Sequence, residues 1–291
     1  MKRSLPPGVE MGGRLARRAL RRAQQKVRYR RLSLQGIPVL FANSFPKSGT
    51  HLLTQILQGF SRLGPAVESG LPAIVTYQGD SGRQRETSEI SRDLSRLLPG
   101  DIGYGHLHAQ PETVEILCNP RFASYLILRD PRDVVVSHVH YVTEMEPDHT
   151  HHQYYTQELD SFEQRLHTSI LGLPGAQIPF PDIRQRLEPY LGWLERPEVA
   201  CLQYEGFVED QQRFIHRILE HAIQRGFPSA VPRERALQIL AASVDPERSP
   251  TFRQGKSGGW REHFSPESKR LFKEVAGDLL VQLGYEANYD W

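Results

Sequence analysis

The chain has 291 residues, 38% of them hydrophobic, and its 36 Lys and Arg against 34 Asp and Glu leave a net charge of +2 at pH 7. A chain of that length can bury a large hydrophobic core. No apolar run is long enough for a membrane-spanning helix, and no apolar segment follows the basic N-terminal residues as it would in a secretory signal. Cys118 and Cys201 lie far apart without C-x-x-C or Cys/His spacing, which argues against a disulfide scaffold or a zinc site and favours a cytoplasmic protein.

The first 31 residues are far more basic than the rest. They hold eleven Lys and Arg and one acid, so they carry +10 and the remaining 260 residues carry −8. A helix over 13–31 is predicted from the i+4 spacing of its apolar residues, Leu15, Ala19, Ala23 and Val27. It could lie solvated on the acidic body, contact an anionic membrane peripherally, attract a polyanionic acceptor, or be a transit peptide. We expect residues 1–36 to be a basic N-terminal helical extension of a single domain over 37–291.

From residue 37 onward, apolar runs typical of strands alternate with amphipathic stretches typical of helices. Strands are predicted over 37–45, 102–108, 124–128 and 199–204. Helices are predicted over 50–60, 87–98, 131–141, 207–225 and from Pro266 to a stop at Gly284. This alternation predicts an α/β fold of three layers, with a central, mostly parallel sheet covered by helices on both faces. The segments 61–86 and 144–181, rich in Gly, Pro, His and polar residues, are predicted to be long loops around a site.

The first predicted strand is joined to its helix by Phe45-Pro46-Lys47-Ser48-Gly49-Thr50. Gly49 permits a close backbone approach, and the free N–H groups at the helix start point at an anion. Lys47 adds a cation, while Ser48 and Thr50 add hydroxyl donors. The segment is not a Walker A loop, because Phe41 and Pro46 stand where that loop has glycines. The alternative is an ordinary strand-to-helix turn with a solvated lysine.

Two further segments carry anion-binding residues. In 126–137, Arg129 ends a strand and can bind a phosphate with two hydrogen bonds, and Ser137 could donate to the same group. A structural Arg–Asp pair is the alternative there. The segment 252–261 combines three glycines, three cations and a tryptophan, which indicates either a flexible anion-binding loop or a basic surface turn.

Together these segments resemble the sulfotransferases that use 3′-phosphoadenosine 5′-phosphosulfate (PAPS). The family's 5′-phosphosulfate loop reads P-K-S-G-T, as residues 46–50 do, and its 3′-phosphate segment R-[ND]-P-[KR]-D-x-x-x-S is matched by 129–137. Its C-terminal loop R-K-G-x-x-G-x-W-[KR] is matched by 253–261, except that Gln254 replaces the lysine. The resemblance, over about 38–285, implies a P-loop-like α/β fold, PAPS as the donor co-substrate, 3′,5′-ADP (PAP) as the product, and no metal.

The resemblance also implies roles for individual residues. Lys47 would bridge the sulfuryl group and the leaving phosphate, and Tyr204 would approach the adenine, with Phe252 as a weaker candidate. The 5′-phosphate would be held by backbone amides of Ser48, Gly49, Thr50 and His51, and the 3′-phosphate segment would comprise Arg129, Ser137, Arg253, Gln254 and Gly255.

The family's general base is a histidine that aligns with His106, in Tyr104-Gly105-His106-Leu107-His108. On an extended strand His106 and His108 would point to the same side, so spacing alone does not choose between them. In the implied mechanism an acceptor hydroxyl or amine attacks sulfur in line with the departing phosphate, and a neutral His106 takes its proton.

Some features depart from the family or compete with this interpretation. Leu52 stands where the cytosolic branch usually has a tryptophan, the dimer motif of that branch is absent, and Gln254 removes a cation. The histidines 138, 140, 149, 151 and 152 suggest a metal site, but we favour a solvated loop on the acceptor side. The rival functions are a P-loop kinase and a catalytically weakened PAPS-fold binding protein. The expected partner is a small-molecule, glycan or lipid acceptor and not nucleic acid; the sequence does not predict the oligomeric state.

Overall fold

The computed structural model describes residues 7–79, 81–248 and 256–291. The strands are β1 (Val39–Ser44), β2 (Val67–Glu68), β3 (Ile74–Val75), β4 (Asp101–His106), β5 (Phe122–Leu128) and β6 (Val199–Gln203). The α-helices are α1 (Pro7–Arg28), α2 (Thr50–Gly59), α3 (Thr87–Ser95), α4 (Pro111–Cys118), α5 (Pro131–His140), α6 (Phe162–Leu171), α7 (Ile183–Leu191), α8 (Tyr204–Glu209), α9 (Gln211–Gln224), α10 (Arg233–Ala241) and α11 (Pro266–Gln282). Short helical turns are η1 (Phe60–Arg62), η2 (Tyr141–Met145), η3 (Tyr154–Glu158), η4 (Pro246–Arg248) and η5 (Gly259–Glu262), of which η2 and η3 are π-helical.

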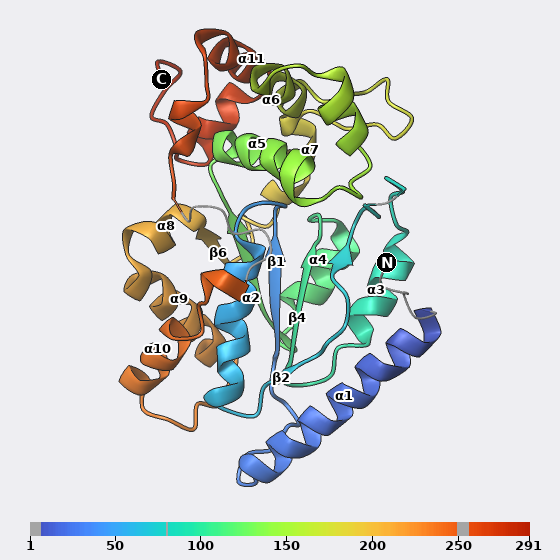
Figure 1. The fold of residues 1–291 in the computed structure, drawn as a ribbon. Coiled ribbons are helices and arrows are strands. Elements are labelled where there is room, and N and C mark those ends of the chain that lie inside the picture. The colour runs from blue at the N-terminus through green and yellow to red at the C-terminus, as the bar shows by residue number, and fades with distance from the viewer. Residues whose placement is uncertain (1–6, 80, 249–255) are drawn as a thin grey trace.

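The strands form one sheet in the order β2-β4-β1-β5-β6, with β3 also paired to β4, and every pairing is parallel. Strand β1 lies in the middle, where Leu40 is in register with Ile102 of β4 on one side and Ala123 of β5 on the other. The chain passes from β1 to β4 on one side and only then to β5 on the other side (Figure 1). Sheets of this kind bind ligands where the strand order reverses, beyond the carboxyl ends of the strands.

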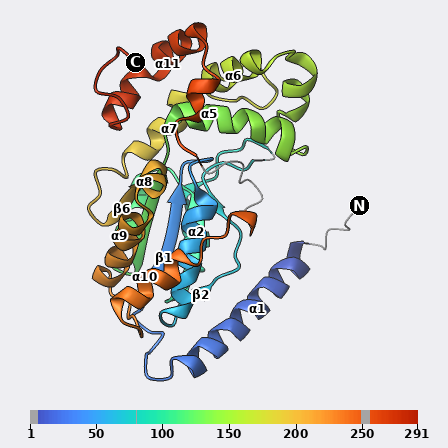
Figure 2. The ribbon, with the colours of Figure 1, turned by 60° about the vertical axis from the view of Figure 1, so that its left-hand side comes forward.

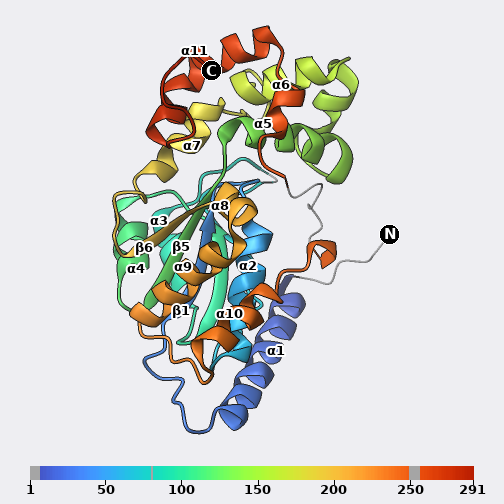
Figure 3. The ribbon, with the colours of Figure 1, turned by 90° about the vertical axis from the view of Figure 1, so that its left-hand side faces the viewer.

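Alternate residues of the central strands enter two separate cores. Leu40 and Ala42 of β1 pack with buried residues of α2, α9 and α10, whereas Val39 and Phe41 belong to the core that includes α3 and α4. The two sets of helices lie on opposite sides of the sheet (Figures 1 and 3). The three-layer α/β fold with a parallel sheet is therefore confirmed.

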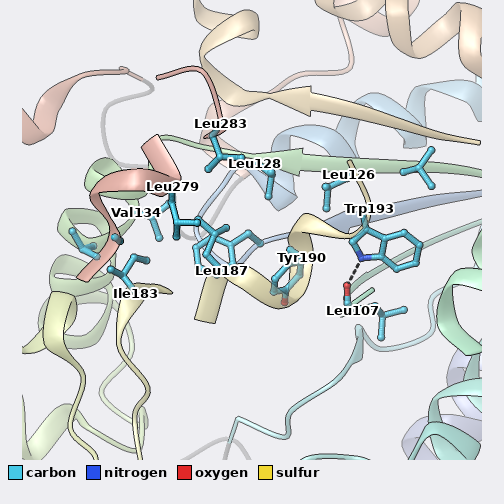
Figure 4. Close-up of a cluster of buried hydrophobic side chains, with 14 of the residues drawn as sticks. Leu107, Leu126, Leu128, Val134, Ile183, Leu187, Tyr190, Trp193, Leu279 and Leu283 are labelled. Atoms are coloured by element: carbon cyan, nitrogen blue, oxygen red, sulfur yellow. Dashed lines mark hydrogen bonds between the residues drawn. The ribbon is translucent and has the colours of Figure 1, made fainter. Parts of the chain in front are cut away.

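A further group of helices, α5, α6, α7 and α11, gathers beyond the carboxyl end of the sheet (Figures 1 and 2). Their apolar side chains meet those of the strands in one buried cluster, where Val134, Leu187 and Leu279 lie close to Leu128 (Figure 4). The indole N–H of Trp193 donates to the carbonyl oxygen of Leu107 at 2.8 Å, which ties this layer to the segment after β4. This layer therefore stands over the edge of the sheet at which the strands end.

The basic helix α1 lies against the body largely through arginines, together with Met11, which packs against the core on the α3 and α4 side. Arg18 is buried and pairs with Asp101, whose carboxylate also accepts from Arg22 at 3.0 Å. Leu15 and Val27 of the predicted apolar stripe are exposed. Among the interpretations of the basic segment, the structure supports a helix docked on acidic groups of the body. Within the described residues, no helix combines the length and hydropathy needed to cross a bilayer.

Several helices differ from the sequence prediction. The predicted helix over 207–225 is two helices, because the carboxylate of Asp210 accepts from the N–H of Arg213 and starts α9 anew. Helices α4, α6, α7 and α10 were not predicted, and α6 together with η2 and η3 occupies much of the segment expected to be a loop over 144–181. The N-terminus of α6 is a capping box in which Ser161 and Gln164 bond each other's backbone. The segment 61–86 holds η1, β2 and β3.

Candidate active site at the carboxyl edge of the sheet

The carboxyl ends of three neighbouring strands bring the predicted residues together. Strand β1 ends directly before the loop 45–50, β4 ends at His106, and β5 ends directly before Arg129. Because β1, β4 and β5 are parallel neighbours, these segments meet at one edge. Tyr204, which follows β6, lies at the same edge, and its ring packs against Gly49. Segments far apart in the sequence thus converge where a ligand site is expected for this topology.

The loop between β1 and α2 turns sharply through two residues of positive φ, Lys47 (68°) and Gly49 (102°). A Cβ atom on Gly49 would lie 2.8 Å from Cδ2 of Tyr204 and 3.2 Å from Cδ1 of Ile127, so this position requires glycine. A non-glycine residue with positive φ, such as Lys47, costs roughly 1–3 kcal/mol, and such strain clusters at ligand sites. The positive φ of Lys47 therefore marks this loop as a candidate for ligand binding.

Hydrogen-bond donors without an acceptor surround this loop. The side chain of Ser48 is fully buried, and its hydroxyl finds no hydrogen-bond partner in the described part of the chain. Gly49 offers no side-chain cap, so the N–H groups of Thr50 and His51 at the start of α2 have no intrahelical acceptor. The side chain of His51 is exposed. A helix N-terminus beside a cation favours the binding of an anion.

Lys47 extends over an aromatic ring contributed by the helix that follows Arg129. Its Nζ lies 3.8 Å from the ring centroid of Tyr141, the first residue of the π-helical turn η2. Burial, together with the nearby charge of Arg129, lowers the pKa of Lys47 to about 8. Ser137 lies one turn before Tyr141 on the same face and is half-buried. The lysine is therefore charged at neutral pH and held against the ring of Tyr141.

His106 is joined to the loop by hydrogen bonds. Its Nδ1 lies 2.9 Å from the carbonyl oxygen of Ser44 and 3.1 Å from the Ser44 hydroxyl, which in turn lies 2.7 Å from Oγ1 of Thr50. A carbonyl oxygen can only accept, so Nδ1 carries the proton and Nε2 of the neutral ring keeps a lone pair. Burial lowers the pKa of His106, and the charges of His51 and Lys47 act in the same direction. The ring is therefore neutral at neutral pH and able to accept a proton at Nε2.

His108 lies in a different environment. Its ring centroid is 4.9 Å from that of Tyr190 and 5.5 Å from that of Tyr77, and burial lowers its pKa to about 4. Strand β4 ends at His106, so the extended backbone that would align the two histidines does not continue to His108. Of the two candidates, His106 is the one bonded to the residues that flank Lys47.

Arg129 links the second and third sequence motifs. Its guanidinium donates to the carbonyl oxygen of Lys256 at 2.9 Å, lies 3.4 Å from the carboxylate of Asp133, and stands 4.8 Å from the ring centroid of Tyr204. Its Nε is buried and makes no hydrogen bond to any described residue. The guanidinium therefore keeps one donor for a group that enters the site.

Asp133 and Arg132 hold the C-terminal loop in place. Asp133 accepts from the backbone N–H groups of Gly258 and Trp260, both at 2.8 Å. Arg132 pairs with Asp130 at 2.7 Å, and its guanidinium lies between the rings of Trp260 and Trp291, at 3.9 and 4.5 Å from their centroids. The start of α5 and the segment after residue 255 are thus one assembly. The predicted donor-site residues Phe252, Arg253, Gln254 and Gly255 lie outside the described residues.

Four contributors to this edge were absent from the sequence prediction. Ser44 contacts His106, Tyr141 contacts Lys47, and Glu205 accepts from the backbone N–H of Asp130 at 2.9 Å. Asp133 belongs to the matched motif 129–137, but no role was predicted for it. No local pattern marks Ser44, because its role depends on the pairing of β1 with β4, whereas Tyr141 could have been found at i+4 from Ser137.

The histidines at the end of α5 and in the segment after it make protein contacts. Nδ1 of His138 lies 3.0 Å from the Ser169 hydroxyl, the ring of His138 stacks on Phe180 with centroids 4.7 Å apart, and His151 Nε2 lies 2.9 Å from the carbonyl oxygen of Ile178. Over the ranges 7–79, 81–248 and 256–291, no group of three His, Cys, Asp or Glu side chains is placed to hold a metal ion. His138 and His151 are buried, so they do not lie in a solvated loop as expected.

Comparison with known proteins gives a family and a fold. The family model described as a sulfotransferase domain matches residues 39–284. A crystal structure of mouse sulfotransferase SULT7A1 complexed with PAP is similar, with 19% identity over 85% of this chain and 86% of that chain and a TM-score of 0.56. Retinol dehydratase in complex with androsterone and PAP, and in a complex with retinol and PAP, matches at 16% identity over 85% of this chain and 83% of that chain, with a TM-score of 0.56 in each case. No protein in the curated set matches significantly.

The family match spans β1 to the end of α11 and includes the loop 46–50 and the segment 129–137. These are the segments on which the sequence resemblance to PAPS-dependent sulfotransferases was based, and the fold agrees with that of solved sulfotransferases. The predicted class is therefore confirmed: the chain belongs to the sulfotransferase family.

Proposed function

We propose that this protein transfers the sulfuryl group of PAPS to a hydroxyl group (or an amine) of a small acceptor, with His106 as the general base. The observation that supports this most directly is the hydrogen-bonded chain from Thr50 through Ser44 to His106. It fixes a neutral imidazole beside the loop that carries Lys47, and a base must be held within reach of the reacting groups.

The donor fits the unpaired groups of the site. The anionic phosphosulfate would be bound by the Ser48 hydroxyl, Lys47 and the first N–H groups of α2. The buried Nε of Arg129 would meet the 3′-phosphate, together with Ser137 and the residues 253–255. Tyr204, which packs on Gly49 beneath Arg129, would lie against the adenine, with Phe252 as a further candidate.

The reaction that follows is a single in-line displacement. The acceptor oxygen forms a bond to sulfur while the bond between sulfur and the 5′-phosphate oxygen breaks, and PAP leaves. Nε2 of His106 takes the proton of the acceptor, since Nδ1 already donates to Ser44. Lys47 and the N–H groups of α2 stabilise the negative charge that grows on the bridging oxygen.

The surroundings of Lys47 and His106 favour an uncharged or anionic acceptor over a cationic amine. Tyr141 lies over Lys47, and the ring of His149 lies 5.8 Å from that of Tyr141. Burial lowers the pKa of His106 and of His149, and the nearby charges of lysine and histidine side chains act in the same direction. The Glu146 carboxylate accepts from the Tyr141 hydroxyl at 3.4 Å. Androsterone and retinol in the structures of retinol dehydratase support a small-molecule acceptor. A glycan or a lipid is the alternative acceptor.

The proposal also covers the organisation of the chain. Residues 37–291 would act as one catalytic domain, and residues 1–36 would be an extension that is not needed to bind the donor. A cytoplasmic location agrees with Cys118 and Cys201 both being free thiols.

Donor binding is tested by thermal unfolding of the full chain with nucleotides. Because a ligand stabilises the state that it binds, 3′,5′-ADP at about 100 times its Kd should add about 2.7 kcal/mol of stability. The same concentration of 5′-ADP, which lacks the 3′-phosphate, should stabilise the protein much less. Equal shifts for both nucleotides would contradict the assignment of Arg129, and turnover of Mg-ATP without PAPS would instead support a kinase.

The transfer step is tested with labelled PAPS offered to a mixed extract of small molecules, with identification of the sulfated product. Lys47→Ala and His106→Ala should abolish transfer while the melting temperature stays near that of the wild type. His108→Ala is the matched control, since its ring packs on Tyr77 and Tyr190, and should keep most of the activity. Full activity of His106→Ala would move the base elsewhere, and PAPS binding without transfer to any acceptor would indicate a binding protein.

A further inference from the structure

Helix α1 turns its polar side toward the protein. Arg14 donates to the carbonyl oxygen of Gly70 at 3.0 Å, Arg18 pairs with Asp101, and Arg22 donates to the carbonyl oxygen of Pro99 at 3.0 Å. These residues recur at intervals of four and therefore share one face of the helix. An ordinary surface helix packs its apolar face inward, so this orientation leaves the apolar face of α1 on the outside.

The outward face carries apolar residues at helical spacing. Leu20 and Val27, seven residues apart on one face, are 61% and 77% exposed, and Leu15 on the flank is 46% exposed. The small residues Ala16 and Ala23 lie between them and are exposed as well. All three views place α1 at the outside of the molecule, with no other helix or strand over its outer side (Figures 1–3). This outer face is a stripe of solvent-exposed apolar side chains on a rigidly anchored helix.

Cations flank the stripe on both sides. Arg17, Lys26, Arg30 and Arg31 are exposed and make no hydrogen bond or ion pair with any residue that the structure describes, while Arg28 rests over the ring of Tyr29 at 5.3 Å. The sequence from residue 11 to 31 contains no acidic residue. The acids of the body near α1, Asp101 and Glu68, are already engaged by Arg18, Arg22 and Arg21. Among the described residues, these exposed cations therefore have no partner of opposite charge.

We propose that the outer face of α1 binds the surface of an anionic lipid membrane, with the helix lying parallel to the bilayer. Lys and Arg can reach up to lipid phosphates while Leu20 and Val27 enter the interface, as in helices that lie on membranes. A second copy of this face would be repelled by its charge. A polyanion would account for the cations but would not engage the apolar stripe between them.

The anchored arginines make this surface preformed. Many membrane-surface helices order only when they bind, which costs conformational entropy. Here α1 is already fixed by the buried Arg18–Asp101 pair, so that cost is paid in the folded protein. The proposal is independent of the donor chemistry, since α1 contributes no residue to the carboxyl edge of the sheet.

The test is sedimentation of the full chain with vesicles of phosphatidylcholine alone or mixed with phosphatidylserine. We expect binding only to the mixed vesicles, weakening as NaCl is raised. Arg17→Gln with Lys26→Gln should reduce binding about fivefold per cation removed, which corresponds to about 1 kcal/mol each. Leu20→Asn with Val27→Asn should reduce binding at unchanged charge by at least about threefold, because the apolar burial is lost. The matched control is Val208→Asn with Ile223→Asn, at positions on α8 and α9 that are each 42% exposed, and it should bind like the wild type.

Two outcomes would overturn the proposal. Absence of binding to the mixed vesicles at low salt would exclude the membrane. If the Leu20 and Val27 variant bound as well as the wild type, and heparin bound the protein with the same dependence on Arg17 and Lys26, the face would be a polyanion site instead. Thermal stabilisation by 3′,5′-ADP in every variant checks that the fold is intact, so failure of the membrane proposal and failure of the proposed function are distinguishable.

Discussion

At the scale of single residues, burial adjusts two side chains to opposite charge states at the same pH. Lys47 loses some of its basicity but stays protonated, while His106 becomes more firmly neutral. In the proposed reaction one must supply a positive charge and the other must accept a proton. Their separation is maintained by different contacts, a ring of Tyr141 for the lysine and the backbone of Ser44 for the histidine.

The lowered pKa of Lys47 predicts how donor affinity depends on pH. Above a pKa of about 8 the free enzyme loses this cation, so the affinity for 3′,5′-ADP should fall by up to about tenfold per pH unit between pH 8 and 9.5. Below pH 8 it should be nearly constant. Lys47→Arg keeps the charge and should show no such fall. Calorimetric titration over this range measures the effect, and a constant affinity for the wild type up to pH 9.5 would refute it.

Ser44 is predicted to be a positioning residue for His106. Ser44→Ala removes the hydroxyl between Thr50 and His106 but keeps the carbonyl oxygen that accepts from Nδ1. Loss of about 1 kcal/mol of orientation should lower kcat about fivefold, with 3′,5′-ADP affinity within twofold of the wild type. Steady-state kinetics and nucleotide titration separate the two effects. A lowered nucleotide affinity with unchanged kcat would show that Ser44 supports the donor loop instead.

At the scale of elements, the start of α5 and the C-terminal loop act as one unit through Asp133. Asp133→Ala leaves the N–H groups of Gly258 and Trp260 without their acceptor and frees Arg129 from its ion pair. Since each such charge-assisted bond contributes about 1.5–3 kcal/mol, 3′,5′-ADP should bind at least about tenfold more weakly. Binding of 5′-AMP, which lacks the 3′-phosphate, should change little. An equal loss for both nucleotides in parallel titrations would indicate general unfolding of the site.

Local sequence patterns were sufficient to predict the elements that carry the proposed donor site. Strand β1, the loop 45–50, α2 and the start of α5 follow from apolar runs, one glycine and the proline of the first helical turn. Helices such as α7, which contains Pro189, were not predicted because their local helix propensity is weak. Tertiary packing of α7 in the buried cluster beyond the sheet stabilises it instead. His106 was preferred to His108 on the family resemblance, because spacing alone did not separate them. The contact of His106 with Ser44, 62 residues away, is one that no local pattern encodes.

At the scale of the whole molecule, electrostatics determine how α1 lies on the body. The apolar spacing predicted a helix but not which side of it faces the body, and the body offers this helix the fully buried carboxylate of Asp101. A buried carboxylate without partners is far more costly than an exposed valine such as Val27. The arginines are therefore drawn inward, and this electrostatic match determines which face of α1 is left outside.

The buried pair predicts a strong dependence of stability on Arg18. Arg18→Ala should lower the melting temperature by about 5–10 °C, because breaking a buried ion pair costs about 3 kcal/mol even with Arg22 still in place. Arg17→Ala on the exposed side of the same helix is the matched control and should change it by less than about 2 °C. The double variant with Asp101→Ala should lose less than the two single losses combined, as calorimetry can show. Strict additivity would mean that the two groups are not coupled.

The three tryptophans of the chain are divided between two places, and this gives the protein an internal optical reporter. The ring centroids of Trp260 and Trp291 lie 5.7 Å apart and both rings contact Arg132, with Trp260 on the loop that Asp133 holds. Trp193 is buried, and its N–H donates to the carbonyl oxygen of Leu107. Indole emission responds to nearby charge and solvent, so a donor that binds beside this loop should change the fluorescence of Trp260 and Trp291 but not that of Trp193. Trp260→Phe should remove most of the change seen on titration with 3′,5′-ADP, while Trp193→Phe should lower only the constant background. Occupancy of the proposed donor site could thus be followed in solution without a label.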